Sequence, residues 1–235
     1  MRQVKAAGAP PLPEGEAKVA AVRSMFDAIA PRYERVNRLL TFGMDARWRR
    51  RTVAALGLAP GSVVLDVAAG TGDLCRALEA AGLAAVGVDL AGNMLAHART
   101  PAPLVQADAL RLPVPAAATD GLTCGFALRN FVDVGAFLAE AARVLRPGGR
   151  LALLEVAAPT NPVLAAGHAV YFNQVVPLVG GLLSDRAAYR YLPRSVAYLP
   201  PVPALLQLVR RAGFEAVERR LLSTGIAQLV TATRR

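Results

Sequence analysis

Three acidic residues in the first half of the chain each lie in or next to a short apolar run. Asp66 lies inside the run Val63–Val67 and precedes the turn Gly70-Thr71-Gly72 by four residues, whereas Asp89 and Asp108 close the next two runs. Glycines in such a turn let the backbone approach a ligand that any Cβ would push away. Strand, glycine turn, helix, strand and acid is the layout of a nucleoside-binding site.

The residues around the turn indicate which nucleoside is bound. A dinucleotide site has a third glycine, in the pattern Gly-x-Gly-x-x-Gly, and Cys75 stands at that position here. The carboxylate of Asp66 would repel a pyrophosphate but would attract an ammonium group, such as that of S-adenosylmethionine. We therefore predict that Asp66, Gly70, Thr71 and Gly72 bind S-adenosylmethionine. For the Thr71 hydroxyl, stabilising the turn is the alternative role.

The two later acids have separate expected roles. Asp89, at the tip of the second strand, is placed to accept hydrogen bonds from both ribose hydroxyls. Asp108 ends the third strand, where it would bond the adenine amino group while Ala109 packs nearby. Met94 is expected to pack under the adenine. The alternative is that these acids are ordinary turn residues of an α/β domain.

Strands and helices that alternate along the chain must position these residues. The predicted strands are Val63–Val67, Ala84–Val88, Leu104–Ala107, Gly121–Phe126, Arg150–Glu155, Ala216–Leu222 and Ala227–Ala232. Helices are predicted at Ala17–Ile29, Tyr33–Leu40, Asp45–Leu56, Asp73–Ala81, Ala91–Arg99, Gly135–Leu145 and Val202–Ala212, with a sharp turn at Pro147-Gly148-Gly149. This alternation predicts an α/β fold with a seven-stranded, mostly parallel sheet and helices on both faces.

One domain is expected to follow a mobile tail at residues 1–16, which is rich in proline. Within residues 17–235, we expect N-terminal helices at 17–60 and a cofactor-binding core at 61–155. A helical lid over the substrate is expected at 156–200, followed by a C-terminal helix and strands at 201–235. Cys75 and Cys124 form neither a disulfide framework nor a metal pattern, and no signal sequence precedes them. We therefore expect a cytoplasmic protein with reduced thiols and without a metal site.

The net charge of +10 is concentrated at the two ends of the chain. Residues 1–60 carry 11 basic against 5 acidic residues, and residues 161–235 carry 9 against 3, whereas residues 61–160 carry 7 against 9. Basic flanks attract polyanions, either nucleic acid or an anionic membrane surface. The alternative is a compositional bias toward arginine. The charge-free stretch Val156–Ser184 is interrupted by prolines and amides, so it is not expected to span a membrane.

Three segments outside the glycine turn are distinctive: Met25–Asn37, Phe126–Asn130 and Tyr189–Leu192. Together they resemble the ubiquinone/menaquinone C-methyltransferase family over about residues 18–225. The resemblance implies a class I S-adenosylmethionine-dependent methyltransferase fold and methyl transfer to a ring carbon of a polyprenylated quinol. Its cofactor positions fall on Thr71, Asp89, Asp108 and Ala109. The chain departs from the family at Gly125, where serine is common, and at Gly225–Leu229, where a histidine is usual.

Within this resemblance, demethylmenaquinol is the expected acceptor. Arg129 and Asn130 follow the fourth strand, where a guanidinium would stabilise a quinolate and an amide would orient a hydroxyl or a water. Pairing with an acid such as Asp108 is the alternative for Arg129. Tyr33 and Tyr189 would wall or hydrogen-bond the ring, with simple packing as their alternative. The two histidines are less informative: His168 is a candidate base in an apolar segment, and His97 is expected to be solvated.

The charge-free segment 156–184 is expected to line an apolar entrance for a membrane-resident quinol, while the basic flanks contact anionic headgroups at the inner face of the cytoplasmic membrane. A core helix or the surface of a homodimer is the alternative. No nucleic acid partner is expected, because the chain lacks an appended RNA-binding module. Two other functions remain open: methylation of a benzoquinol, a small phenol, a sterol or RNA, and a non-catalytic scaffold that binds S-adenosylmethionine.

Overall fold

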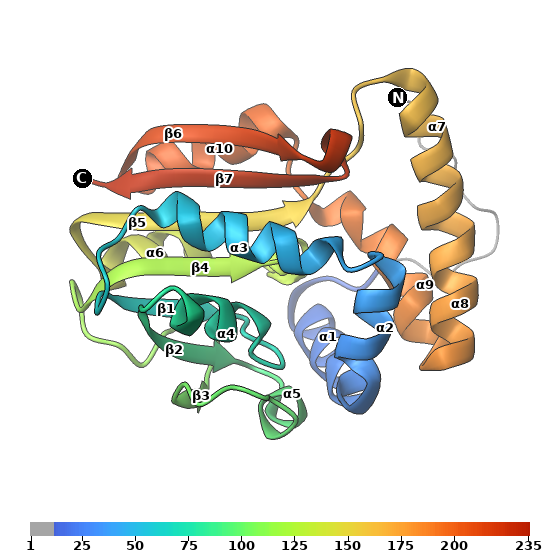
Figure 1. Ribbon diagram of the computed structural model, residues 1–235, viewed down its shortest axis with the longest axis horizontal. Coiled ribbons are helices and arrows are strands. Elements are labelled where there is room, and N and C mark those ends of the chain that lie inside the picture. The colour runs from blue at the N-terminus through green and yellow to red at the C-terminus, as the bar shows by residue number, and fades with distance from the viewer. Residues whose placement is uncertain (1–11) are drawn as a thin grey trace.

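A seven-stranded sheet forms the centre of the molecule, as the alternation of elements predicts (Figure 1). The computed structural model describes residues 12–235. The strands are β1 (Val63–Val67), β2 (Ala84–Asp89), β3 (Leu104–Gln106), β4 (Thr119–Gly125), β5 (Leu145–Val156), β6 (Phe214–Leu222) and β7 (Ala227–Arg234). Their order across the sheet is β3-β2-β1-β4-β5-β7-β6, and β7 alone runs antiparallel to its neighbours. All seven predicted strands are present.

Helices cover both faces of this sheet and form two separate hydrophobic cores. One face carries α3 (Met44–Leu56) and α4 (Asp73–Ala80), which bury Trp48 and Leu78 against the strands. The other carries α6 (Val134–Val144) and α10 (Val202–Arg211), which bury Phe137 and Val209. Because helices cover both faces of the sheet, β1 and β4 are buried at almost every position, and β1 is apolar except for Asp66.

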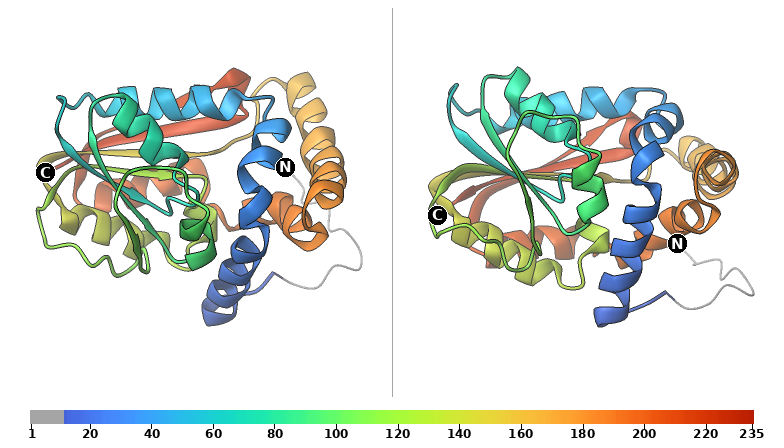
Figure 2. Two further views of the ribbon diagram at one scale, coloured as in Figure 1. Left: turned by 60° about the horizontal axis from the view of Figure 1, so that its bottom comes forward. Right: turned by 90° about the horizontal axis from the view of Figure 1, so that it is seen from below.

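A third group of helices lies beyond the carboxyl ends of the parallel strands, where Figure 2 shows α1 and α2 between the sheet and α7–α8. The group contains α1 (Gly15–Ile29), α2 (Tyr33–Leu40), α5 (Gly92–Ala96), α7 (Pro162–Val170), α8 (Val176–Leu183) and α9 (Arg186–Ser195). A π-helical turn, Tyr171–Val175, joins α7 to α8 into one helix. The sequence did not predict α7, α8 and α9 as individual helices.

The continuous helix Pro162–Leu183 is long and apolar enough to cross a membrane by length and composition. Only 11% of its most apolar window is buried inside the protein. Contacts with the rest of the domain hold the middle and the carboxyl-terminal end of this helix. Tyr171 of the π-helical turn donates a hydrogen bond to the Leu40 carbonyl oxygen at 2.8 Å, and α8 packs on α9 immediately after the turn at Ser184.

Several predicted boundaries differ from the structure. Pro147-Gly148-Gly149 is not a turn before the fifth strand but a bulge inside β5, because the pairing jumps from Thr119–Leu145 to Gly121–Arg150. Helix α5 ends at Ala96 rather than Arg99, since the Arg99 N–H donates to the Thr71 carbonyl instead of continuing the helix. The predicted tail lies outside the described residues up to position 11, and helix α1 already begins at Gly15.

Gly180 allows α8 and α9 to pack closely. A Cβ at this position would lie 2.2 Å from the ring of Tyr189, which is itself buried. We expect Gly180→Ala to destabilise the protein by about 1–3 kcal/mol, because overpacking forces the ring or the helix to move. Gly167→Ala on α7 is the matched control, since nothing lies within 4 Å of its Cβ. Urea unfolding of both variants checks the prediction, and equal stabilities would contradict it.

Candidate active site

A cavity with about 880 Å³ of space, part of it open to solvent, lies at the carboxyl ends of β1, β2 and β4. Its lining includes six residues that the sequence predicted for the site: Tyr33, Gly70, Asp89, Asp108, Ala109 and Asn130. Gly125 also lines it, as do Val19, Val22, Arg23 and Phe26 of α1. The structure therefore brings together most of the candidate cofactor residues and two of the three candidate catalytic residues.

The glycine turn after β1 has a left-handed backbone at both glycines, with φ of 57° at Gly70 and 82° at Gly72. A Cβ on Gly70 would meet no protein atom within 4 Å, so the backbone here is open toward the cavity. A Cβ on Gly72 would lie 2.7 Å from a methyl carbon of Thr100. The first glycine therefore leaves room for a ligand, and the second lets the turn pack against the chain behind it.

Asp89 is the acid with the most defined position in the cavity. Its two carboxylate oxygens accept hydrogen bonds from the Gly70 and Ala91 backbone N–H groups, each at 2.8 Å. Burial raises the pKa of Asp89, although these backbone bonds oppose the shift. Each oxygen retains a second lone pair, so the carboxylate can accept from two further hydroxyls. This geometry fits the predicted ribose contact.

The rest of the cavity fits an adenosine with an attached amino acid. Asp108 is an exposed acid whose Oδ1 accepts from the Leu110 N–H at 2.9 Å, and the buried side chain of Met94 lies in the apolar wall near Ala109. At the turn, the buried Thr71 Oγ1 has no hydrogen-bond partner among residues 12–235. An unpaired buried hydroxyl of this kind is costly unless a ligand satisfies it. The donor set and the shape therefore fit S-adenosylmethionine.

Asp66 is not part of the cavity wall, which corrects the expectation that its carboxylate contacts the ligand directly. Its side chain lies inside the sheet, 1% exposed, where Oδ1 accepts from the Thr123 hydroxyl at 2.7 Å. The Cys75 thiol donates to the other oxygen at 3.6 Å. A side chain in the middle of a strand points into the adjacent layer rather than past the strand end. Asp66 therefore joins β1 to β4 and to helix α4.

Burial raises the pKa of Asp66 to about 7, and the hydrogen bond from Thr123 opposes this rise. Since the folded protein holds this proton more tightly than the unfolded chain, the contribution of Asp66 to stability is lost as pH rises from about 4 to 7. We expect Asp66→Asn to remove this loss. Relative to the wild type, the variant should gain about 2–4 kcal/mol between pH 4 and pH 8. Urea unfolding across this range measures the difference, and a constant difference would contradict the prediction.

Arg129 is also buried away from the cavity, so the expectation that its guanidinium faces the acceptor is corrected. Its Nη1 forms an ion pair with Glu155 at the end of β5, and its Nε donates to Ser195 Oγ of α9 at 3.1 Å. The side chain is 4% exposed. The alternative that Arg129 pairs with an acid is therefore confirmed, with Glu155 in place of Asp108. The sequence holds no local signal for this partner, which lies 26 residues away.

Asn130, the next residue, does line the cavity. It ends a 3-10 turn, Leu128–Asn130, after β4, and its amide oxygen accepts a hydrogen bond from the Tyr191 hydroxyl at 3.2 Å.

Nearby, Lys18 of α1 is buried and donates to the Phe131 carbonyl at 2.7 Å, and its Nζ lies 3.7 Å from the centre of the Tyr198 ring. Burial lowers the pKa of Lys18. A buried lysine on α1 was not predicted from the sequence.

Tyr33 lines the cavity on the side of α2, with its ring packed edge to face against Phe26. Burial raises the pKa of Tyr33 above its usual value, so its hydroxyl keeps its proton at neutral pH. Arg49, the nearest positive charge in its surroundings, opposes this shift. A neutral phenol in the wall is a hydrogen-bond donor rather than a base.

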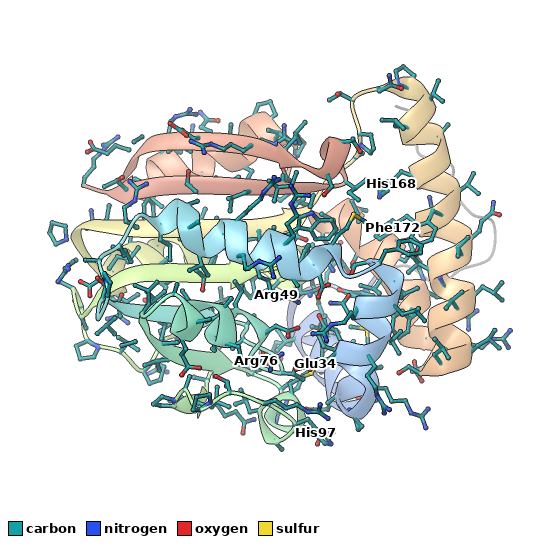
Figure 3. The ribbon with its side chains drawn as sticks, in the orientation of Figure 1. Glu34, Arg49, Arg76, His97, His168 and Phe172 are labelled. Carbon is teal, nitrogen blue, oxygen red and sulfur yellow. The ribbon has the colours of Figure 1, made fainter. Side chains whose placement is uncertain are left out.

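A charged network that the sequence did not predict holds α2 and α3 against the glycine turn. Arg76 of α4 bonds Glu34 of α2 at 3.0 Å, pairs with Asp73 and donates to the Thr71 carbonyl. Arg49 of α3 bonds the same Asp73 at 3.1 Å (Figure 3). Arg49, one of the four arginines at residues 47–51, is therefore buried between Asp45, four residues before it on the same helix, and Asp73, which it meets only in the fold.

The remaining candidates lie elsewhere. His168 is on α7 with its ring stacked on Phe172 at 5.5 Å, outside the cavity lining (Figure 3). His97 is exposed, as predicted, and its Nδ1 lies 2.9 Å from the Asn93 carbonyl oxygen. Tyr189 is buried between α8 and α9, and its hydroxyl has no hydrogen-bond partner within residues 12–235. It therefore packs rather than contacts the cavity.

Known proteins with similar sequences share this layout over nearly the whole chain. A model of the ubiE/COQ5 methyltransferase family matches residues 14–234. A ubiquinone/menaquinone biosynthesis C-methyltransferase from Syntrophotalea carbinolica is 45% identical over 90% of this chain and 93% of its own length. A demethylmenaquinone methyltransferase from Thermus thermophilus is 47% identical over 87% of this chain and 97% of its own length.

Solved structures share the fold at lower sequence identity. A methyltransferase from Thermotoga maritima superposes with a TM-score of 0.65 at 19% identity, over 90% of this chain and 99% of its own. A phosphoethanolamine methyltransferase from Haemonchus contortus, determined with S-adenosylmethionine, superposes at 0.58 and 15% identity, over 79% of this chain and 52% of its own. The predicted class I methyltransferase fold is confirmed.

Proposed function

Because this chain belongs to the ubiE/COQ5 methyltransferase family, we propose that it methylates a ring carbon of demethylmenaquinol to give menaquinol. The chain is a methyltransferase of quinone biosynthesis that uses S-adenosylmethionine and acts on a lipophilic quinol. The proposal adds that this quinol is a naphthoquinol. Relatives from three bacterial genera that carry the name demethylmenaquinone methyltransferase support it, at 41–47% identity. The observation that carries the proposal is the cavity itself, which is lined by the acids Asp89 and Asp108 and also by Tyr33 and Asn130.

The chemistry needs a nucleophilic ring carbon and an in-line methyl group. When bound, S-adenosylmethionine supplies an electrophilic methyl on a sulfonium. A quinol that has lost one phenolic proton donates electron density to its ring carbon. The new C–CH₃ bond then forms as the S–CH₃ bond breaks, and the ring carbon finally releases its proton. The protein contributes by fixing the two partners in line and by stabilising the quinolate oxygen.

We assign these tasks to specific side chains. Asp89 and Asp108 hold the nucleoside, and the open backbone at Gly70 and the unpaired Thr71 hydroxyl receive the amino-acid part. Tyr33, as a neutral phenol, and the Asn130 amide donate hydrogen bonds to the quinol oxygens. Arg129 has a positioning role, since its buried ion pair fixes the turn that carries Asn130.

A substrate panel tests the acceptor. The purified enzyme is incubated with S-adenosylmethionine carrying a deuterated methyl group and with demethylmenaquinol, a demethylated benzoquinol, a small phenol or RNA, and products are identified by mass spectrometry. We expect label on the naphthoquinol ring. Transfer to the benzoquinol or the phenol alone would replace the acceptor, and binding of S-adenosylmethionine without any transfer would support a scaffold. Accumulation of demethylmenaquinone in cells lacking the protein is the corresponding result in vivo.

We further propose that the enzyme works at the inner face of the cytoplasmic membrane, with α7–α8 lying on the lipid surface. The outer side of this helix exposes Val163, Val170, Leu178 and Leu182, by 79%, 53%, 60% and 77%, and the adjacent turn exposes Phe42 by 74%. Exposed arginines flank this apolar surface on the 3-10 turn Ala30–Arg32, on α2 and on α9: Arg32, Arg35, Arg38, Arg186 and Arg190. An apolar face with cationic flanks suits an anionic lipid surface. Contacts that hold the middle and the carboxyl-terminal end of this helix against the domain favour lying on the membrane over crossing it.

Vesicle binding tests this orientation. We expect the protein to float with vesicles that contain phosphatidylglycerol, and Leu178→Glu with Leu182→Glu to reduce the bound fraction about tenfold or more. Leu221→Glu, an exposed leucine on β6, is the matched control and should bind like the wild type. If the double variant binds vesicles normally, the surface is not a lipid contact. A wild-type dimer that the same double variant converts to a monomer would instead assign the surface to a second copy of the chain.

A further inference from the structure

Tyr191 does not line the cavity but contacts one residue that does, Asn130. Its hydroxyl donates to the amide oxygen of Asn130 at 3.2 Å, across 61 residues of sequence. Asn130 lines the cavity, whereas Tyr191 does not. Among residues 12–235, no hydrogen bond connects the Asn130 NH₂ group to another residue. The amide oxygen is therefore occupied on the protein side, and the NH₂ group is the part of the amide left for the cavity.

The surroundings keep Tyr191 in the donating state. Burial raises its pKa to about 12, with Tyr198 adding to the rise and Arg129 opposing it, so the hydroxyl retains its proton at any physiological pH. Helix α9, which carries Tyr191, is fixed by the bond from Arg129 Nε to Ser195 Oγ, and by its Asp185 cap. The same Arg129 precedes Asn130. The buried guanidinium of Arg129 thus fixes the positions of both Asn130 and Tyr191, the two partners of the hydrogen bond.

We infer that Tyr191 is a positioning residue that orients the Asn130 amide with its NH₂ group toward the acceptor. In this orientation the amide donates a hydrogen bond to a quinolate oxygen, which is the charge that the reaction develops or maintains. In the opposite orientation the amide oxygen would face that charge and repel it. The inference deepens the proposed function, because it rests on the assignment of Asn130 to the acceptor side.

A double-mutant cycle tests the inference on a short-chain demethylmenaquinol. Tyr191→Phe keeps the ring and removes the hydroxyl, so we expect kcat to fall about five- to tenfold, the value of one hydrogen bond. The Kd for S-adenosylmethionine and the midpoint of thermal unfolding should stay unchanged. In an Asn130→Ala background, Tyr191→Phe should have no further effect, because the hydroxyl acts only through the amide. Tyr198→Phe is the matched control and should retain wild-type kcat.

Asn130→Asp tests which group faces the acceptor. An aspartate presents only oxygens, so it should be at least as inactive as Asn130→Ala if the NH₂ group is the working donor. Retained activity in Asn130→Asp would overturn the orientation. Additive effects of Tyr191→Phe and Asn130→Ala, or an unchanged kcat in Tyr191→Phe alone, would overturn the role of Tyr191 while leaving the proposed function intact. Wild-type activity of Asn130→Ala would instead remove Asn130 from the proposed site.

Discussion

Replacing Asp89 by alanine is expected to weaken S-adenosylmethionine binding by about 10²–10⁴-fold. Two hydrogen bonds from ribose hydroxyls to a carboxylate are worth about 1.5–3 kcal/mol each. The substitution also frees the Gly70 and Ala91 N–H groups that the carboxylate holds at 2.8 Å, so the glycine turn loses a fixed position. Isothermal titration calorimetry with S-adenosylmethionine and with S-adenosylhomocysteine measures the loss.

Two further variants make the Asp89 result specific. Asp89→Asn retains the shape and one acceptor oxygen, so its affinity should fall between those of the wild type and Asp89→Ala. Glu215→Ala removes an exposed carboxylate on β6, far from the cavity lining, and should bind like the wild type. Equal affinities in the wild type and Asp89→Ala would exclude the cavity as the S-adenosylmethionine site.

The second large effect concerns folding rather than binding. Arg129→Ala leaves the carboxylate of Glu155 buried without its partner, which costs about 3–5 kcal/mol in comparable buried pairs. For a chain of this length, such a loss lowers the midpoint of thermal unfolding by about 6–20 °C. Calorimetry or denaturant unfolding measures it. Arg111→Ala removes an exposed arginine and is the control.

Removing both charges distinguishes the buried pair from a direct catalytic group. Arg129→Met combined with Glu155→Gln replaces the pair by residues of similar size without leaving a buried charge, so it should recover much of the lost stability. If Arg129→Ala keeps its stability but loses turnover, the guanidinium acts on the acceptor after all. The prediction then fails, because the ion pair would carry no structural load.

Most of the part of the protein that is assigned to the methyl donor, from β1 to β3, was predictable from the sequence. Its sequence signals lie within a few residues of the positions they specify. Strand β1 was predicted at its observed bounds, and helix α2 likewise. The glycine turn and the acid after β2 occur at fixed offsets from their strands, so Gly70 and Asp89 could be placed from spacing alone. Residues that follow parallel strands share one edge of the sheet, which is why they converge on one cavity.

The part of the protein that is assigned to the quinol acceptor was less predictable, because its contacts join segments that are far apart in sequence. Arg129 was expected at the sheet edge, and its position there is right, but the direction of its side chain depends on Glu155 and Ser195. Asp66 was expected to reach the ligand, although a mid-strand side chain points into the next layer. Lys18 resembles any surface lysine of an amphipathic helix until the fold places Phe131 and Tyr198 against it.

The bond between Arg129 and Ser195 has an evolutionary consequence. The segment between β5 and α10 is continuous in sequence and adds no strand to the sheet, so it resembles a unit that could be exchanged whole. Yet its helix α9 completes a buried charge cluster with residues that follow β4 and end β5. In a chimera that takes this segment from another methyltransferase without an equivalent of Ser195, the buried Arg129 Nε loses its hydrogen-bond acceptor. We therefore expect substrate specificity to change more readily through point substitutions within this segment than through exchange of the whole segment.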